Sequence, residues 1–384
     1  MSPPSTRFPP QAHRAGSRWH NAGMTSTTKV LPAWTILAPA AGWLLLAGSL
    51  AVGGSFYVLL MAIGLACCVF AAVHHAEVVA HRVGEPYGSL VLAAAVTVIE
   101  VVLIVSLMVS GGASTSALAR DTVFATVMII LNGMVGLCLL AGGTLHGEQR
   151  FGRYGVNASL AALASIVVLT LVLPNYTTTV PGPEYSPSQL AFVAIVSLLL
   201  YATFVFVQAV RHRDYFLPEG AAVDQDTHAE PPTPSAAAAS AGLLMACLGA
   251  VVLLAKATSP FVEAAVASAN APKALVGVII AAVVLMPEGL AAFRAARANR
   301  LQTSLNLALG SALATIGLTI PAVALVSLLT GWTLTLGIDT KSTVLLSLSL
   351  VVATLSLGTG RTTMLQGAVH LVIFAVYLFT TIVP

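Results

Sequence analysis

Two apolar stretches of this chain each carry one carboxylate near their middle: residues 95–105 read AVTVIEVVLIV, and residues 283–293 read VVLMPEGLAAF. The two acids are Glu100 and Glu288. Each lies within an apolar run as long as a membrane-spanning helix needs, which is about 20 residues. A carboxylate at the centre of a bilayer costs about 3 kcal/mol, so we expect each acid to be neutralised by a proton or by a bound cation.

Similar apolar runs recur along the whole chain, with short polar breaks between them. Of the 384 residues, 57% are hydrophobic and 8% are charged, whereas a soluble domain has about 25% charged residues. The sequence therefore predicts an all-α polytopic membrane protein. We expect eleven transmembrane helices, at 32–51, 56–81, 86–110, 121–143, 156–174, 188–210, 238–268, 273–297, 301–329, 342–357 and 362–383.

The positive charges predict how these helices are oriented. With the amino terminus inside, thirteen of the 17 Lys and Arg residues fall on the inner side, three on the outer side, and Lys256 within a span. Short cytoplasmic loops carry such an excess of Lys and Arg. We therefore expect a multi-pass protein of the inner (plasma) membrane, with its amino terminus cytoplasmic and its carboxyl terminus extracytoplasmic.

The polar segments divide the chain into parts. Residues 1–29 lack the apolar core of a signal peptide and are expected to be a disordered cytoplasmic tail, within which Met24 offers an alternative start. The long polar break holds acidic residues that could attract cations and regulate flux, although a flexible solvated linker is the favoured explanation. The predicted parts are the tail (1–29), an extra first transmembrane helix (30–55), a first repeat (56–210), an acidic Pro/Ala-rich cytoplasmic linker (211–237) and a second repeat (238–384).

The spacing of acids within spans suggests that the two halves are related. Glu77 precedes Glu100 by 23 residues, and Glu263 precedes Glu288 by 25 residues. Because each half contains five spans, an odd number, the second must enter the membrane from the opposite side. Two inverted five-helix repeats are typical of secondary transporters with a site at the membrane midplane.

If the repeat brings Glu100 and Glu288 to one site, protons and cations compete for the same negative charge. Such competition is the physical basis of antiport: binding of the cation expels protons, and binding of protons expels the cation. The alternative is that each glutamate is permanently protonated and hydrogen-bonded to a neighbouring helix. Intramembrane acids are usually functional, which favours the first interpretation.

Oxygen ligands beyond the carboxylates are also present within the spans. Pro287 removes a helical donor and frees the carbonyl of Val283, a suitable ligand for a hard cation, although a packing kink is an equal explanation. Asn132 and Asn306 offer amide oxygens that could instead tie helices together. Ser311 is a small residue suited to close packing that also carries a hydroxyl.

A second group of ionisable residues lies on one helix face. His74, Glu77 and His81 stand at positions i, i+3 and i+7, which suits a proton relay, interfacial packing or a metal site. Glu263 is the corresponding acid of the second half. The chain has no HExxH, Walker, GxSxG or CxxC motif, so we expect no enzymatic activity and no cofactor. A net charge of +3 is too small to predict a nucleic-acid partner.

Four long stretches resemble a known superfamily. They are GEPYGSLVLAAAVTVIEVVLI (84–104), ARDTVFATVMIILNGMVGLCLLAGG (119–143) with the following GEQRF, VVLMPEGLAAFRAARANRLQTSLNLALGSALATIGLTIP (283–321) and RTTMLQGAVHLVIFAVYLF (361–379). From about residue 56 onward, the chain resembles the Ca²⁺:cation antiporters, specifically the bacterial calcium/sodium:proton antiporters of the ChaA type. The resemblance implies that Glu100 and Glu288 bind the cation and exchange it for protons. It also matches Glu77 to an accessory acid and Asn132 to a family amide.

The chain departs from the wider pattern beside both acids. The usual Gly-Asn-Ala is replaced by Val96, Thr97 and Val98 before Glu100, which leaves the Thr97 hydroxyl as the polar group there. Before Glu288 the same positions hold only apolar residues. In the second repeat, Ala314 replaces a Gln, with Thr315 beside it. Fewer amide ligands leave room for Na⁺ or K⁺ as well as Ca²⁺.

The sequence thus predicts a secondary active antiporter that extrudes Ca²⁺, Na⁺ or K⁺ in exchange for protons by alternating access. Its partners are the transported cations, protons and the lipid bilayer, and the sequence predicts no oligomeric state. A channel would need a continuous polar pore, and an intramembrane enzyme would need a nucleophile or a metal constellation. The two isolated acids in apolar helices fit neither alternative.

Overall fold

The structure of the protein, a computed structural model, describes residues 31–51, 53–84, 87–111, 115–217 and 231–383. It is almost entirely helical. The elements are α1 (Ala33–Gly48), α2 (Ser55–Val83), α3 (Tyr87–Gly111), α4 (Leu118–Met128), η2 (Ile129–Met134), α5 (Val135–His146), β1 (Gln149–Arg150), α6 (Arg153–Val167), η3 (Val168–Val172), η4 (Leu173–Tyr176), α7 (Pro187–Phe206), η5 (Val207–Arg211), η6 (Arg213–Tyr215), α8 (Pro234–Ser268), α9 (Ala274–Arg297), α10 (Leu301–Thr330), α11 (Thr340–Leu357), β2 (Arg361–Thr362) and α12 (Met364–Ile382).

The helices fall where the hydropathy pattern predicts them. Among the described residues, nine helical stretches are long and apolar enough to cross a membrane. Two shorter apolar helices, Ala33–Gly48 and Ala95–Val109, complete the eleven expected positions. The prediction of an all-α polytopic membrane protein is therefore confirmed.

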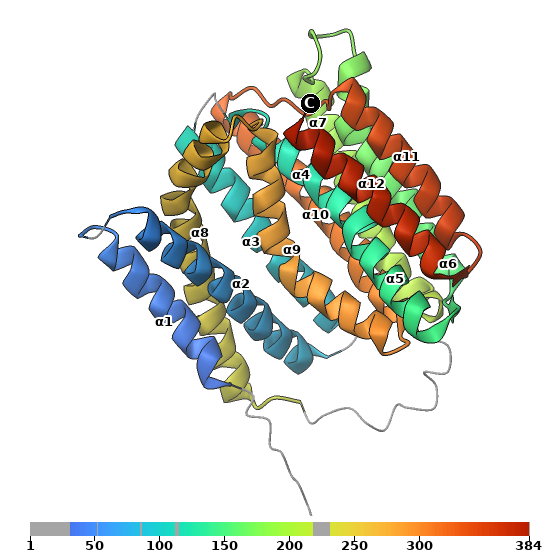
Figure 1. Ribbon diagram of the computed structural model, residues 1–384, viewed down its shortest axis with the longest axis horizontal. Helices are drawn as coiled ribbons and strands as arrows, with labels where there is room; N and C mark the ends of the chain where they lie inside the picture. Colours follow the sequence, from blue (N-terminus) through green and yellow to red (C-terminus); the bar gives the residue numbers. More distant parts are fainter. Residues whose placement is uncertain (1–30, 52, 85–86, 112–114, 218–230, 384) are drawn as a thin grey trace, which may run out of the picture.

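The bundle has two packed regions with two helices between them (Figure 1). Helices α1, α2 and α8 lie together on one side and share an apolar cluster that includes Cys68, Cys247 and Leu254. A larger cluster joins α4 to α7 with α10, α11 and α12 on the other side. Helices α3 and α9, which carry the two central glutamates, run between these regions, and residues of both form a small cluster with α8.

The packing is reciprocal between the two predicted halves. Helix α5 packs against α12, while α10 packs against α7; α4 packs against α9, while α3 packs against α10. Helices α7 and α12, the last of each half, both begin with a capping box, Ser186 with Gln189 and Thr363 with Gln366. Each box satisfies free backbone donors at a helix start. These correspondences support two inverted repeats, whose layout stays a prediction.

The structure differs from the prediction in two local features of the backbone. The strands β1 and β2 pair antiparallel, Gln149 with Thr362, and join the loop before α6 to the loop before α12. The π-helical segments η2, η3 and η5 interrupt three of the spans. Neither feature has an apolar period that a sequence pattern could reveal, because both arise from tertiary contacts.

The ends of the predicted linker 211–237 are also structured. Phe216 is buried and packs edge to face against Phe204, with ring centroids 5.9 Å apart. Helix α8 begins at Pro234, four residues earlier than predicted, because Thr233 caps the helix and Pro suits its first position. The predicted tail 1–29 and linker residues 218–230 lie outside the described residues.

Candidate functional site

Glu100 lies at the middle of α3 and is 2% exposed. Its Oε2 accepts a hydrogen bond of 2.7 Å from the hydroxyl of Thr315 on α10. Its Oε1 is buried and has no hydrogen-bond partner among the described residues. A carboxylate buried with only one donor is poorly compensated, so it can accept a further positive group.

Glu288 lies in the second half of α9, directly after Pro287. Both of its carboxylate oxygens are buried, and neither finds a hydrogen-bond partner in the described part of the chain. The charges of Glu100 and Glu77 lie close enough to act on it. The two predicted acids, which are 188 residues apart in sequence, therefore lie within range of each other's charge.

Further oxygen atoms lie next to this acid pair along its helices. Thr97 is buried one turn before Glu100 on α3, and Ser311 is half-buried one turn before Thr315 on α10. Residues three or four apart share a helix face, so both hydroxyls stand on the side of the acids. Pro287 lies inside α9 and cannot donate to the carbonyl of Val283.

The accessory residues divide into two groups. Glu77 is exposed on α2, and its charge reaches both Glu288 and His74. His74 also contacts the Trp34 ring of α1, at a centroid distance of 5.6 Å, and the structure leaves His81 exposed at the end of α2. Glu263 is not near the pair: it is exposed on α8 and accepts a hydrogen bond of 3.0 Å from Ser259.

Asn132 is fully buried in the π-helical segment η2, where two other helices engage its amide. Its Nδ2 donates to Ser349 Oγ of α11 at 2.8 Å, and its Oδ1 lies 3.3 Å from His370 Nδ1 of α12. Ser349 and His370 are not among the site residues predicted from the sequence. The sequence does carry a signal for His370, because it is an ionisable residue inside an apolar span.

Asn306 lies away from the acid pair. It precedes Thr315 by nine residues on α10, which is about 13 Å along a helix axis. Its Nδ2 donates to the carbonyl of Phe216, and its Oδ1 accepts from Gln302 at 2.9 Å. The structure therefore makes Asn306 a tie between the start of α10 and the segment after α7.

The geometry limits the kind of ion that the site can hold. Within the described residues, no group of three or more His, Cys, Asp or Glu side chains could hold a metal ion. The oxygens around the acid pair come from carboxylates and hydroxyls, which suit protons and hard cations rather than zinc or copper. The donor atoms here are therefore oxygens, which are the ligands that small hard cations prefer.

The fold and this buried acid pair define a class of protein, the helical-bundle ion exchangers. Native YfkE has the same fold, with a TM-score of 0.70 and 17% sequence identity over 91% of this chain and 100% of that one. The H⁺/Ca²⁺ exchanger CAX has a TM-score of 0.68 and 14% identity over 90% of this chain and 87% of that one. The sodium/calcium exchanger protein family matches residues 54–210 and 239–383. The chain belongs to this family, and it is a membrane transporter rather than an enzyme.

Two relatives are similar over most of their length. The protein y4hA of Sinorhizobium fredii, whose name describes an ionic transporter, is 49% identical over 92% of this chain and 97% of its own. The sodium-potassium/proton antiporter ChaA of Escherichia coli is 38% identical over 84% of this chain and 87% of its own. The resemblance to antiporters of the ChaA type is therefore confirmed.

Proposed function

We propose that this protein is a secondary active cation:proton antiporter in which Glu100 and Glu288 form one site shared by the cation and protons. The observation that carries the proposal is that these two buried carboxylates have almost no groups around them that compensate their negative charge. Three of its four carboxylate oxygens are buried without a hydrogen-bond partner among the described residues, and the fourth accepts only from Thr315. Two such carboxylates cannot both stay charged and empty in a membrane interior.

The need to neutralise these carboxylates also explains why a cation must be exchanged for protons. The pair can be neutralised by protons or by a cation, and each ligand removes the charge that attracts the other. If the site changes its access from one side of the membrane to the other only when its charge is neutralised, it carries the cation in one direction and protons in the other. The sheltered position of α3 and α9 between two packed regions is compatible with access that alternates from one side to the other.

We propose Na⁺ or K⁺ as the preferred cation, with Ca²⁺ as a weaker substrate. Besides the two carboxylates, the site offers the Thr97, Ser311 and Thr315 hydroxyls and, among the described residues, no side-chain amide oxygen, and hydroxyls are weaker ligands for Ca²⁺ than carboxylates and carbonyls. The Val283 carbonyl is one further neutral ligand. The relative named as a sodium-potassium/proton antiporter supports this choice.

The accessory acid fits the same proposal. Glu77 is exposed on α2, yet its charge reaches Glu288. We assign it to the mouth of the site on the side that the charge distribution predicts to be cytoplasmic, where it would pass protons or attract cations. The protein would then work in a bacterial plasma membrane, with two inverted repeats that contribute one glutamate each.

The test is proton flux in proteoliposomes that hold the full-length protein and a pH-sensitive dye. Inward-directed gradients of Na⁺, K⁺ or Ca²⁺ should each be tried. We expect cation-driven proton release that is lost in Glu100→Gln and in Glu288→Gln. Glu148→Gln is the matched control, because Glu148 is a surface residue whose oxygen lies 3.5 Å from Arg150, and it should transport as the wild type does.

Two results would overturn the proposal. Transport at the wild-type rate by either central variant would show that the acid pair is not the site. Cation flux without proton movement would instead favour a channel, which is the alternative function for a membrane protein of this kind.

A further inference from the structure

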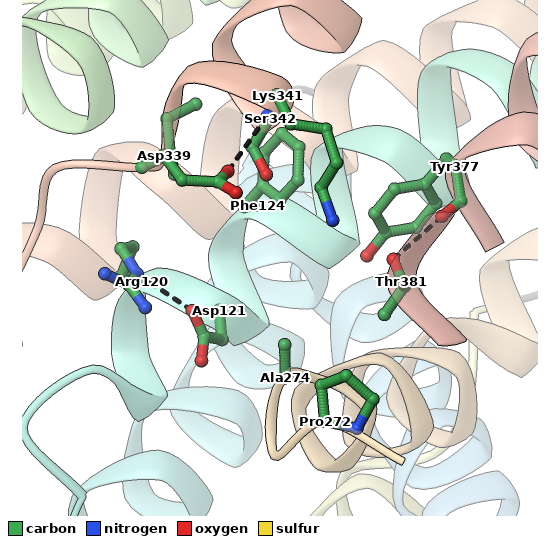
Figure 2. A pocket seen from close by; sticks show the side chains of 11 residues that line it. Arg120, Asp121, Phe124, Pro272, Ala274, Asp339, Lys341, Ser342, Tyr377 and Thr381 are labelled. Carbon is green, nitrogen blue, oxygen red and sulfur yellow. Dashed lines mark hydrogen bonds and ion pairs between the residues drawn. The ribbon is translucent and has the colours of Figure 1, made fainter. Parts of the chain in front are cut away.

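A pocket of about 250 Å³ opens at one end of the bundle, between the starts of α4, α9 and α11 and the end of α12 (Figure 2). The charge distribution predicts this end to be extracytoplasmic. The pocket is lined by both polar and apolar side chains and does not include the central glutamates. The polar side chains that line it include those of Arg120, Asp121, Asp339, Lys341, Tyr377 and Thr381.

The charged groups of the pocket are held in place by specific contacts. Arg120 Nε donates to Asp121 Oδ1 at 2.8 Å, and Arg120 also donates to the Gly337 carbonyl at 3.1 Å. Lys341 Nζ donates to the Thr380 carbonyl at 2.6 Å. The wall therefore holds two basic groups and two carboxylates, Asp121 and Asp339, so the pocket carries no excess of fixed negative charge that would attract a metal cation.

Polar groups continue from the pocket into the bundle on α4. Thr122 and Thr126 follow Asp121 and stand one turn apart on one face, and both are buried almost completely. Within the part of the chain described here, neither hydroxyl oxygen has a hydrogen-bond partner. A buried hydroxyl without a partner costs about 1–3 kcal/mol, and proteins commonly avoid this cost with an ordered water.

Helix α4 and its continuation lead from the pocket to the acid pair. A methyl group added at Gly277 of α9 would lie 3.0 Å from the backbone of Asp121 and Thr122, and one at Gly289, next to Glu288, would lie 3.3 Å from Met134. The two helices therefore run side by side from the pocket to the level of Glu288. At 1.5 Å per residue, Thr126 stands about 10 Å from that level, which a short chain of water molecules can bridge.

We propose that this pocket is the entrance of a proton route to Glu288, with Asp121 as the group that takes up the proton and the Thr122 and Thr126 hydroxyls as its hydrated continuation. The proposal rests on the antiport function above and adds a path for protons that the metal cation does not use. A proton moves by exchange along hydrogen bonds, so a row of hydroxyls and water molecules can carry it where a metal ion would find too few oxygen ligands.

The surroundings of Asp121 define what else titrates there. Arg120 shares its helix, Asp339 and Lys341 come from the start of α11, and Tyr377 comes from α12. From α9 and the turn before it the pocket receives Ala274 and Pro272, which do not titrate. Asp121 and Asp339 are thus the two carboxylates of the pocket. Asp339 caps the start of α11, where its Oδ1 accepts a hydrogen bond of 2.9 Å from the Ser342 backbone amide.

The experiment separates two modes of the same protein in proteoliposomes. Cation:proton exchange needs both ligands, whereas exchange of a labelled cation for the same unlabelled cation needs no proton movement. We expect Asp121→Asn to slow cation:proton exchange by about tenfold or more and to leave cation self-exchange within about twofold of the wild type. Glu288→Gln should lose both modes, and failure of that control would count against the antiport function instead.

A second variant tests the hydrated path without a change of charge. Thr126→Val keeps the volume and removes the hydroxyl, so it should slow only the proton-coupled mode, and Thr126→Ser should restore it. Thr354→Val is the matched control, because the Thr354 hydroxyl is exposed and bonds only to the Leu350 carbonyl of its own helix. Equal loss of both modes in Asp121→Asn, or no loss of proton coupling in either variant, would overturn the proposal.

Discussion

The hydroxyl of Thr315 donates a hydrogen bond of 2.7 Å to Oε2 of Glu100, and it connects two helices, α10 and α3. Glu100 is 2% exposed, so this donor is its only hydrogen-bond partner within the described residues. The bond orients one carboxylate oxygen and leaves the other buried without a hydrogen-bond partner among the described residues. Thr315 directly follows Ala314, the position that holds a Gln in the wider superfamily pattern.

We therefore predict that Thr315→Val weakens cation binding. The variant removes an oxygen ligand and the donor that orients Glu100, and a hydrogen bond to a charged group contributes about 1.5–3 kcal/mol. The apparent KM for the cation should rise by about tenfold or more, while Thr315→Ser should stay close to the wild type. Initial rates of cation-driven proton release would measure both. An unchanged KM in Thr315→Val would remove Thr315 from the site.

The wild-type protein should show direct competition between protons and the cation. Because both ligands need the ionised form of the same carboxylates, a lower pH must raise the apparent KM for the cation without lowering the maximal rate of cation self-exchange. In the acidic range the KM should rise by about tenfold per pH unit for each proton displaced. Self-exchange measured at equal pH on both sides tests this. A KM that does not change with pH would mean that the two ligands bind at separate sites.

The network around Asn132 should act on stability more than on cation affinity. Ser349→Ala removes the acceptor of the Asn132 amide, and His370→Ala removes the group opposite its oxygen. Each leaves a buried polar atom without its partner, which costs about 1–3 kcal/mol. Thermal unfolding in detergent should show a lowered Tm for both variants. Ser347→Ala is the control, since the Ser347 hydroxyl is exposed and bonds only to the Thr343 carbonyl.

Measurements on Asn132→Ala can show whether Asn132 is instead a ligand of the transported cation. If Asn132→Ala raised the apparent KM for the cation while its Tm stayed unchanged, the amide would be a ligand, as its resemblance to the family amide implies. The described geometry favours the structural role, because both ends of the amide already face side chains of α11 and α12.

The sequence predicted the helices because an apolar run of spanning length has few alternatives in a membrane. It also predicted Glu100 and Glu288, since a carboxylate is costly there and therefore noticeable. It could not separate Asn132 from Asn306, because an amide inside a span looks the same whether it faces an ion or another helix. Only the contacts with Ser349 and with the Phe216 carbonyl distinguish their surroundings.

Other parts of the site depend on distances that no local pattern encodes. The hydrogen bond between Thr315 and Glu100 joins residues 215 positions apart in sequence. The pocket at Asp121 is built from the ends of four helices that a linear sequence does not place together. The positions of Glu77 and Glu263 also depend on the tertiary structure. Their spacing in the two halves predicts that they are equivalent, yet of these two acids only Glu77 lies within charge range of Glu288.

The crossing of α5 and α12 should tolerate no added side-chain volume. Helices α5 and α12 approach at Gly367, where a Cβ would collide with the backbone of Leu140, and at Gly143, where it would collide with the backbone of Met364. Backbone atoms cannot move aside as a flexible side chain can, so overpacking here should cost about 1–3 kcal/mol or more. We expect Gly367→Ala and Gly143→Ala to lower the Tm and the yield of folded protein. Gly310→Ala is the matched control, because a Cβ at Gly310 would meet nothing within 4 Å, and Ala favours the helix. A Tm for Gly367→Ala equal to that of Gly310→Ala would show that α5 and α12 are not in such close contact.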